Sequence, residues 1–259
     1  MYFDIYVGVD GTGPDSNAEY ATAFRNSYVN QLRNKSFGVS EYERGPTLTG
    51  SETGRLASWA AGRAEHHYRT NKIRGPNTPR IFMAGYSRGG AAVIEACQQL
   101  NDRGIPVQGL LLFDAVDRSY TVERTETVPS NVRYCRHAIR QANSGSRQSF
   151  GNCGLLAARG VDWVTPKEFL TTHGGMGGTP WGASAATAGG GRISEGDNSI
   201  RGVLRAVGNV PTPQTWIASR AASAVYEYAM ATEVTPEQER RGSEGVWNWM
   251  LTELPRMRL

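Results

Sequence analysis

The stretch PRIFMAGYSRGGAAVIEACQQL, residues 79–100, decides the fold of this chain. Residues 79–85 form a short apolar run that predicts a strand, and residues 91–100 predict a helix. Between them, Gly85-Tyr86-Ser87-Arg88-Gly89 matches Gly-x-Ser-x-Gly, which holds a serine at a strained strand-to-helix turn. Both glycines are needed because side chains there would strike the neighbouring strand and helix. The stretch therefore predicts that Ser87 is a nucleophile at the carboxyl edge of a sheet.

Further strands and helices alternate on both sides of this turn. Strands are expected at residues 2–9, 107–113, 132–138 and 168–172, and helices at 17–32 and 52–68, with a loop at 33–51. Strands with uniformly apolar interiors are typical of parallel sheets that are covered on both faces and joined by right-handed crossovers. We expect one α/β domain over residues 1–259, with a mostly parallel sheet flanked by helices.

The composition changes after His173. Residues 174–191 contain eight glycines in eighteen positions, which predicts a Gly-rich loop or lid over residues 173–205. Large apolar residues then recur at helical spacing in 213–232 and 236–259. The C-terminal part, 213–259, is therefore expected to form helices that pack on the sheet.

Composition and charge exclude several classes of protein. Of the 259 residues, 39% are hydrophobic and the net charge is +4, which does not fit a disordered chain. The basic residues are scattered, so we expect no nucleic-acid partner. No apolar run approaches the roughly 20 residues of a transmembrane helix. The first residues include Asp4 and no basic cluster, so we expect synthesis in the cytoplasm without a cleavable signal.

Three cysteines, Cys97, Cys135 and Cys153, are too few and too irregularly spaced for a disulfide scaffold or a zinc site. Pairing of Cys135 with Cys153 stays open. We expect neither a metal nor a cofactor, because serine hydrolysis requires none.

A serine nucleophile needs a base, and the base needs an acid that orients it. In α/β-hydrolases these follow along the chain in the order serine, acid, histidine. Asp114 ends the most apolar strand, at the edge where such folds place their sites. We expect Asp114 to be the acid, with Asp117 as a rival and Asp162 as a weaker one.

The four histidines supply the candidates for the base. His66 and His67 precede the serine on a helical stretch, where adjacent side chains diverge by about 100°. His137 lies on or just after a strand and stays an alternative. His173 follows the last expected strand and precedes a run of glycines, which fits the required order. We therefore expect His173 to be the base.

Two backbone N–H groups are expected to bind the oxyanion of the reaction. One belongs to Arg88, the residue after the nucleophile. The other comes from the turn at Gly11 and Thr12, after the first strand, where Thr12 could also donate its hydroxyl. Asp10 and Tyr86 flank these donors and are expected to contact the substrate.

These motifs together resemble the α/β-hydrolase catalytic domain of the type VI secretion phospholipase (lipase) effectors and their uncharacterised bacterial and fungal relatives. The family's motifs are matched, in order, by Asp10-Gly11-Thr12, Gly85-Tyr86-Ser87-Arg88-Gly89 with Tyr for Phe, Asp114-Ala115-Val116, His137-Ala138, Arg147-Gln148-Ser149-Phe150, and His173 with its following glycines. The resemblance extends from about residue 2 to residue 178.

The resemblance implies a serine esterase that cleaves lipid or phospholipid esters through a Ser87-His173-Asp114 triad. For an effector it also implies export by a contact-dependent secretion system and an immunity or secretion-carrier protein as partner. Two alternatives stay open: a cytosolic esterase or thioesterase for a small soluble acyl substrate, and a non-catalytic binding module on the same scaffold.

Overall fold

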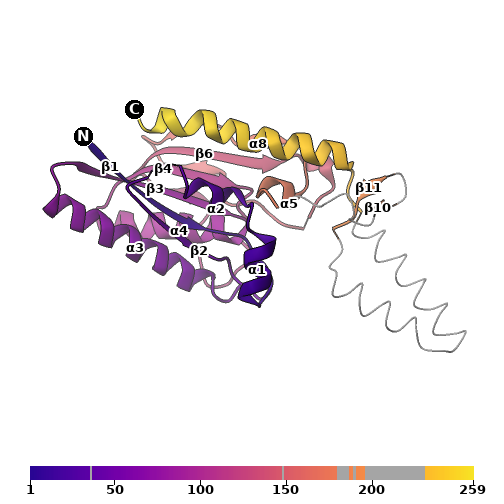
Figure 1. Cartoon of the computed structure of the whole chain (residues 1–259), viewed down its shortest axis with the longest axis horizontal. Helices are drawn as coiled ribbons and strands as arrows, with labels where there is room; N and C mark the ends of the chain where they lie inside the picture. Colours follow the sequence, from indigo (N-terminus) through magenta and orange to yellow (C-terminus); the bar gives the residue numbers. More distant parts are fainter. Residues whose placement is uncertain (36, 148, 180–186, 189–190, 196–230) are drawn as a thin grey trace, which may run out of the picture.

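The computed structural model describes residues 1–35, 37–147, 149–179, 187–188, 191–195 and 231–259 (Figure 1). Most of the expected Gly-rich loop or lid at 173–205 and nearly all of the expected helix at 213–232 lie outside the described residues. The two ends of the chain lie close together, since Nε of Arg258 is 3.2 Å from a carboxylate oxygen of Asp4.

A seven-stranded parallel sheet forms the centre of the molecule. Its order is β2-β1-β3-β4-β6-β8, and β9 also pairs with β6. The strands are β1 (Tyr2–Val9), β2 (Val39–Glu43), β3 (Thr78–Tyr86), β4 (Val107–Phe113), β6 (Val132–Arg140), β8 (Asp162–Trp163) and β9 (Lys167–Phe169). The sheet, its flanking helices and the turn at Ser87 between β3 and α4 confirm the α/β-hydrolase-like fold predicted from the sequence.

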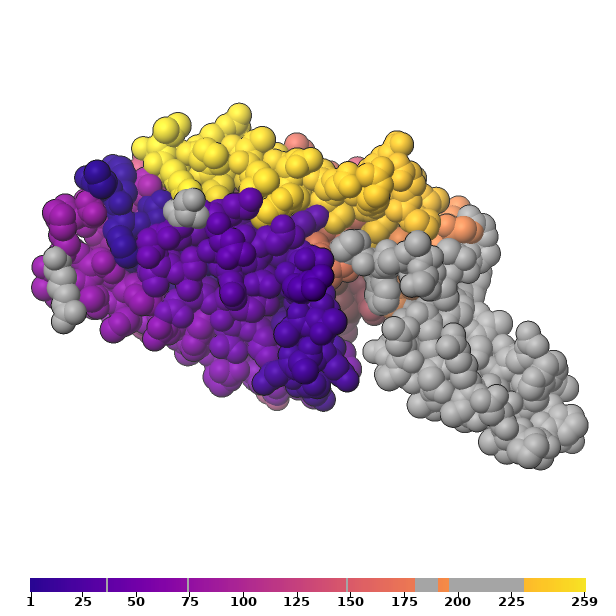
Figure 2. Space-filling model, viewed as in Figure 1, coloured from indigo at the N-terminus to yellow at the C-terminus, as the bar shows by residue number. Residues whose placement is uncertain are grey.

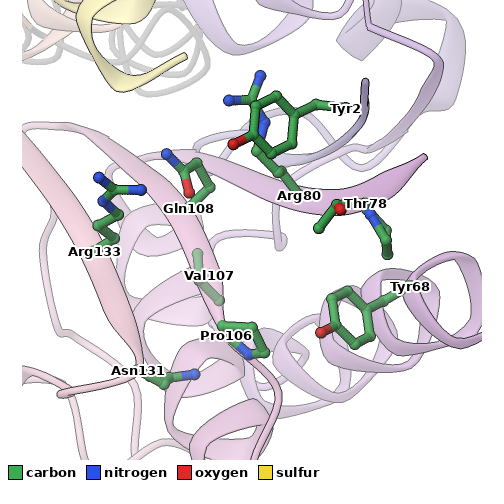
Figure 3. A pocket seen from close by; sticks show the side chains of 10 residues that line it. Tyr2, Tyr68, Thr78, Arg80, Pro106, Val107, Gln108, Asn131 and Arg133 are labelled. Atoms are coloured by element: carbon green, nitrogen blue, oxygen red, sulfur yellow. The ribbon is translucent and has the colours of Figure 1, made fainter. Parts of the chain in front are cut away.

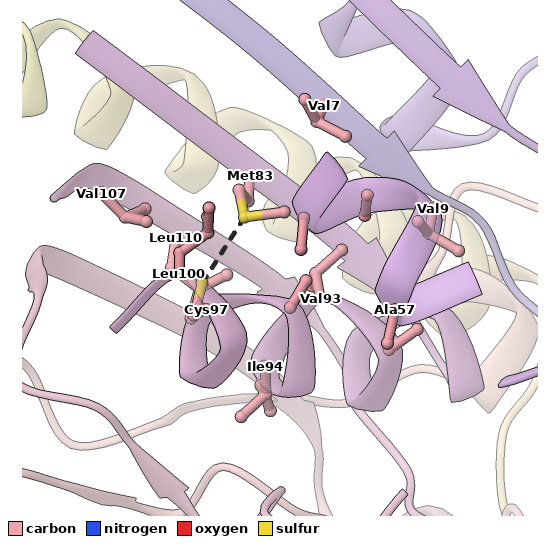
Figure 4. Packing of buried hydrophobic residues seen from close by; sticks show 14 of the residues in the cluster. Val7, Val9, Ala57, Met83, Val93, Ile94, Cys97, Leu100, Val107 and Leu110 are labelled. Atoms are coloured by element: carbon pink, nitrogen blue, oxygen red, sulfur yellow. Dashed lines mark hydrogen bonds between the residues drawn. The ribbon is translucent and has the colours of Figure 1, made fainter. Parts of the chain in front are cut away.

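Two helices, α3 (Thr53–Arg74) and α4 (Arg88–Asp102), cover one face of the sheet. Small side chains let them approach closely: Ala57 and Ala61 of α3 and Ala92 and Ala96 of α4 are all fully buried. Figure 4 shows Val93 and Cys97 of α4 packed against the strands, with the sulfurs of Cys97 and Met83 3.6 Å apart. Burial of this apolar layer fixes α4, and hence its first turn, against the centre of the sheet.

The opposite face is covered by α8 (Pro236–Met257) together with α1 (Asn17–Ala23) and α2 (Tyr28–Leu32). Helix α8 lies along the N-terminal half of the chain (Figure 2). Its buried residues Val246, Met250, Leu254 and Met257 recur at helical spacing and form one apolar stripe. Thr235 begins the helix with a capping box, which satisfies backbone groups that would otherwise lack partners.

Three expected elements differ from the structure. The helix expected at 17–32 is broken into α1 and α2, because Ser27 caps α2 and also donates a hydrogen bond to the buried Asp10. The loop expected at 33–51 contains the edge strand β2. The strand expected at 168–172 ends at Phe169, and the chain turns to begin the one-turn helix α5 (His173–Met176).

The smaller elements are β5 (Thr127–Val128) paired with β7 (Leu156–Ala157), β10 (Thr187–Ala188) paired with β11 (Arg192–Ile193), and the 3-10 turn at Ala142–Ser144. All three cysteines are free and buried, so Cys135 and Cys153 do not pair. Among the helices of the described ranges, none has the length and apolar character needed to cross a bilayer.

Candidate active site

Ser87 lies in a backbone conformation that few residues other than glycine adopt. Its φ and ψ are 55° and −128°, at the sharp turn from β3 into α4. A Cβ atom on Gly89 would lie 2.2 Å from the carbonyl oxygen of Asp10, and one on Gly85 would lie 2.5 Å from that of Gly89. Real Cβ contacts are never this short. The two glycines therefore allow the turn to sit against β1 and present the serine at the sheet edge.

Backbone strain gathers around this serine. Within the described part of the chain, the non-glycine residues with positive φ are Ser87, Asp114 and Arg147. Ser87 and Asp114 contact the side chain of His173, and Ser146, next to Arg147, contacts its backbone. Such conformations cost about 1–3 kcal/mol each and occur mainly at functional sites. The strain therefore marks this edge of the sheet as the candidate active site.

Three side chains from distant parts of the sequence form a continuous hydrogen-bonded chain. Nε2 of His173 lies 2.9 Å from Oγ of Ser87. Nδ1 of His173 lies 2.7 Å from Oδ2 of Asp114. All three residues are buried, with Asp114 fully so. When Asp114 accepts the Nδ1 proton, Nε2 is left as the acceptor for the serine hydroxyl.

The carboxylate of Asp114 is held by more than the histidine. Arg140 donates to it from both its guanidinium and its backbone N–H, and Nδ2 of Asn152 donates to Oδ1 over 2.7 Å. Burial acts to raise the pKa of Asp114, but the hydrogen bond and charge of His173, the charge of Arg140 and the bond from Asn152 outweigh it. The pKa of Asp114 is thus well below its usual range, and the acid stays ionised beside the imidazole.

The imidazole of His173 is fixed through its backbone. Tyr86 donates its hydroxyl to the His173 carbonyl over 2.9 Å, and the His173 N–H donates to Ser146 Oγ over 2.7 Å. The preceding residue, Thr172, donates its N–H and hydroxyl to the buried carboxylate of Glu239 on α8. His173 thus begins the hydrogen-bonded turn of α5, where a Gly-rich loop or lid was expected to start. Ser146 and Glu239 were missed by the sequence analysis, since only the folded chain brings them to residue 173.

The rival acids lie elsewhere. Asp117 accepts hydrogen bonds from the Thr125 hydroxyl and the Ser119 N–H. Asp162 lies in β8 and forms an ion pair with Arg136. Among the described residues, neither carboxylate contacts an imidazole, whereas Asp114 lies 2.7 Å from Nδ1 of His173, the candidate base.

The other histidines are also placed away from the serine. Nε2 of His137 accepts a hydrogen bond from the Ala115 N–H over 3.1 Å beneath the site. Burial lowers the pKa of His137 to about 4, so this ring stays neutral and supports the strand end structurally. His67 pairs with Glu41 on the far side of α3, and the ring of His66 lies against that of His67.

The backbone N–H groups of Arg88, directly after the serine, and of Thr12 have no acceptor among the described residues. The Gly11 N–H, also expected as a donor, instead binds Oδ1 of Asp10 over 3.0 Å. Thr12 lies beside the site because its hydroxyl accepts from the Arg88 side chain over 3.2 Å. We therefore assign the oxyanion to the Arg88 and Thr12 N–H groups as a proposal.

Asp10 and Tyr86, expected to contact the substrate, are both buried supports. The Asp10 carboxylate accepts hydrogen bonds from Ser27, Tyr42 and the Gly11 N–H, which holds the turn into Thr12. Tyr86 packs its ring 5.1 Å from the imidazole ring and donates to the backbone of His173. Asp10 is fully buried and Tyr86 is 4% exposed, and their hydrogen bonds support the turn into Thr12 and the backbone of His173.

Asp10→Asn is expected to flatten part of the pH dependence of stability. Burial raises the pKa of Asp10 to about 7, whereas an unfolded aspartate titrates near pH 3.9. The folded protein therefore binds the proton more tightly, and this contribution to stability is full below about pH 4 and is lost as the pH rises through 7. The free energy of unfolding of the variant should gain about 4 kcal/mol relative to wild type between pH 4 and pH 8.

Denaturant titrations of both proteins at several pH values check this expectation. The exposed Asp15→Asn variant serves as the matched control and should follow the wild type at every pH. A difference between Asp10→Asn and wild type that is constant from pH 4 to pH 8 would show that folding does not raise the pKa of Asp10.

A pocket of about 270 Å³ lies at the opposite edge of the sheet (Figure 3). It opens at the amino ends of β3 and β4, whereas Ser87 follows the carboxyl end of β3. Its Arg80 is already paired with the carboxylate of Asp4 over 2.8 Å and 3.1 Å. The pocket is therefore separate from the candidate active site by the length of a strand.

The comparisons with known proteins give distant likenesses only. No family model and no curated protein matches the chain. YbtT, a type II thioesterase from the yersiniabactin NRPS/PKS biosynthetic pathway, is 22% identical over 44% of this chain and 43% of its own, with a TM-score of 0.31. A cutinase-like protein from Cryptococcus sp. is 19% identical over 49% of this chain and 60% of its own, with a TM-score of 0.29.

An uncharacterized protein from Pseudomonas aeruginosa is 14% identical over 92% of this chain and 47% of its own, with a TM-score of 0.42. The aligned part is less than two thirds of the length of each of these three proteins. At this level of likeness no residue role, substrate or partner is transferred to the chain.

Proposed function

We propose that the chain is a serine hydrolase that cleaves carboxylic esters of lipids through an acyl-enzyme. The observation that carries the proposal is the hydrogen-bonded chain from Ser87 through His173 to Asp114, with the serine at a strained strand-to-helix turn. An ordinary buried serine needs neither a base at 2.9 Å nor this backbone conformation. Both serve to make a hydroxyl nucleophilic and to expose it to a carbonyl.

The reaction follows from the roles of these three residues. Oγ of Ser87 attacks the ester carbonyl while its proton moves to Nε2 of His173, and Asp114 stabilises the imidazolium. The Arg88 and Thr12 N–H groups bind the negative oxygen of the tetrahedral intermediate. That intermediate breaks its bond to the alcohol, which takes the proton from His173. Water then gives a proton to the same ring and attacks the acyl-enzyme. As the bond from the acyl carbon to Oγ breaks and the acid leaves, the imidazolium returns the proton to Oγ of Ser87.

Two exposed apolar side chains, on loops whose backbone contacts the Arg88 side chain, support a lipid as the substrate. Leu48 and Tyr120 are exposed by 72% and 81%. The loops that carry them are joined to the residue after the nucleophile, since Arg88 donates to the carbonyls of Leu48 and Arg118. Exposed apolar groups of this kind suit contact with a lipid surface. The resemblance to phospholipase effectors points to a glycerophospholipid in particular.

Hydrolysis of one short-chain ester below and above its micelle concentration tests the proposal. We expect the rate per enzyme to rise at least about tenfold when a lipid surface forms, because Leu48 and Tyr120 then have an apolar partner. Leu48→Ser with Tyr120→Ser should reduce this rise, while exposed Ile73→Ser, on α3, should not. Full activity on the monomer with no rise would favour a small soluble acyl substrate. A folded protein with no hydrolysis would favour a binding module.

A further inference from the structure

The entrance of the site carries two arginines whose charges are not neutralised. Arg88 donates from Nε to the Arg118 carbonyl over 3.1 Å, so the Arg88 guanidinium lies against the backbone of Arg118. Arg118 donates to Ser149. In the described residues, neither guanidinium has a carboxylate within ion-pair distance, and Nη2 of both groups has no acceptor.

Two neighbouring arginines, in contrast, each lie beside a carboxylate. Arg140 is paired with Asp114, and Arg147 lies 3.8 Å from the carboxylate of Glu195. Glu52 acts on Arg88 only at longer range and accepts its hydrogen bond from Thr47.

The surroundings of Arg88 disfavour its charged form. Burial and the charge of Arg118 together lower the pKa of Arg88, and the attraction of Glu52 does not offset them. Two like charges near one another, with a counter-charge only at longer range, disfavour the charged form of each group. An anion that bound between them would remove the repulsion and would accept charge-assisted hydrogen bonds.

This pair lies close to the reacting atoms. Arg88 follows Ser87 directly, and one of its Nη1 bonds is to Thr12, next to the proposed oxyanion donors. The guanidinium of Arg118 lies 4.9 Å above the ring of Phe150, and that ring lies 5.5 Å from the imidazole of His173. These contacts place the pair within reach of the substrate whose ester Ser87 would attack.

We propose that Arg88 and Arg118 form a subsite for a phosphate group carried by the substrate. The inference rests on the proposed hydrolase function and narrows it to acyl esters or thioesters that bear a phosphate. The planar guanidinium suits phosphate oxygens. The two guanidinium groups carry two positive charges, which is more than the single negative charge of a phosphodiester. Such a phosphate has two sources, the headgroup of a glycerophospholipid and the phosphates of a soluble coenzyme A thioester.

Matched substrate pairs test the subsite. The lipid pair is dihexanoyl phosphatidylglycerol and dihexanoylglycerol, and the soluble pair is butyryl coenzyme A and the butyryl thioester of N-acetylcysteamine, all as monomers. In at least one pair we expect kcat/KM to favour the phosphate-bearing member by about tenfold or more. The pair that shows the preference identifies the source of the phosphate.

The arginine variants assign the preference. Arg118→Gln and Arg88→Gln should each lower the ratio of the two kcat/KM values about tenfold, and salt should lower it in the wild type. Arg133→Gln removes an exposed arginine at the opposite edge of the sheet and should keep the ratio. No preference in either pair, or a preference that both variants keep within twofold, would overturn the subsite.

A binding measurement separates this proposal from the proposed hydrolysis. In Ser87→Ala, calorimetry should show tighter binding of the phosphate-bearing member, and Arg118→Gln in that background should weaken it about tenfold. If the wild type hydrolyses none of the four compounds but this difference is found, hydrolysis fails and the subsite stands. Equal binding of both members of each pair overturns the subsite.

Discussion

Ser87→Ala is expected to lower kcat on any ester that the wild type hydrolyses by about 10⁴- to 10⁶-fold. The alanine keeps the turn between β3 and α4 but removes the Oγ atom that lies 2.9 Å from His173. Without a nucleophile, only binding and oxyanion stabilisation remain. Steady-state rates of purified variants with matched unfolding curves measure the loss. Ser130→Ala, at an exposed serine of the opposite edge, should retain the wild-type rate.

The same experiment identifies the base. His173→Gln should lose activity by a factor similar to that of the serine variant, because triad members act as a unit. His137→Gln is the matched control: a glutamine can still accept the Ala115 N–H, and the hydroxyl of Ser87 is untouched. We expect His137→Gln to stay within about tenfold of the wild type. The reverse order of the two histidine variants would assign the base to His137.

Asp114→Asn is expected to lower kcat about 10⁴-fold while leaving the fold in place. The amide can donate to Nδ1 and so hold the imidazole in the wrong tautomer, and it no longer balances the imidazolium charge. The variant also leaves Arg140 without its buried partner. Loss of one member of a buried pair costs about 3–5 kcal/mol, so the free energy of unfolding of the variant should be lower than that of the wild type. Its kcat is therefore measured under conditions in which the unfolding curve shows the variant to be folded.

The free energy of unfolding of the wild type and that of Asp114→Asn should depend differently on pH below about pH 4. The folded pKa of Asp114 is depressed, so its contribution to stability is present above about pH 4 and is lost as the pH falls further. Asp114→Asn should lack that dependence. Asp117→Asn is the control for the rate, because Asp117 binds Thr125 and Ser119. If Asp117→Asn lost more activity than Asp114→Asn, the acid would be Asp117.

The sequence predicts the parts of this site that depend on local chemistry or on chain order. The turn at Ser87 is encoded by five adjacent residues, and its glycines are explained by contacts with β1 and α4. Asp114 is predicted as the acid because it ends an apolar strand, and His173 is predicted as the base because it is the last histidine of the chain. Parallel strands bring these ends to one edge, so order along the chain is enough to place them.

The supports of the site depend on contacts between distant residues. Glu239 reaches Thr172 across 67 positions of the chain, and Ser146 reaches His173 across 27. No periodicity or motif marks such pairs. The break between α1 and α2 has the same origin, since Ser27 donates a hydrogen bond to Asp10, the residue after β1. The choice of Thr12 over Gly11 as a donor likewise depends on where one carboxylate points.

The most direct measurement is the site and rate of modification by a fluorophosphonate, read by mass spectrometry of the intact protein and its peptides. The account predicts one adduct per chain, on Ser87, formed rapidly in wild type and His137→Gln and at least about 10³-fold more slowly in His173→Gln. An adduct on another serine, or an unmodified Ser87 in the folded wild type, would contradict it. So would a Ser87 that reacts equally fast without the imidazole at position 173.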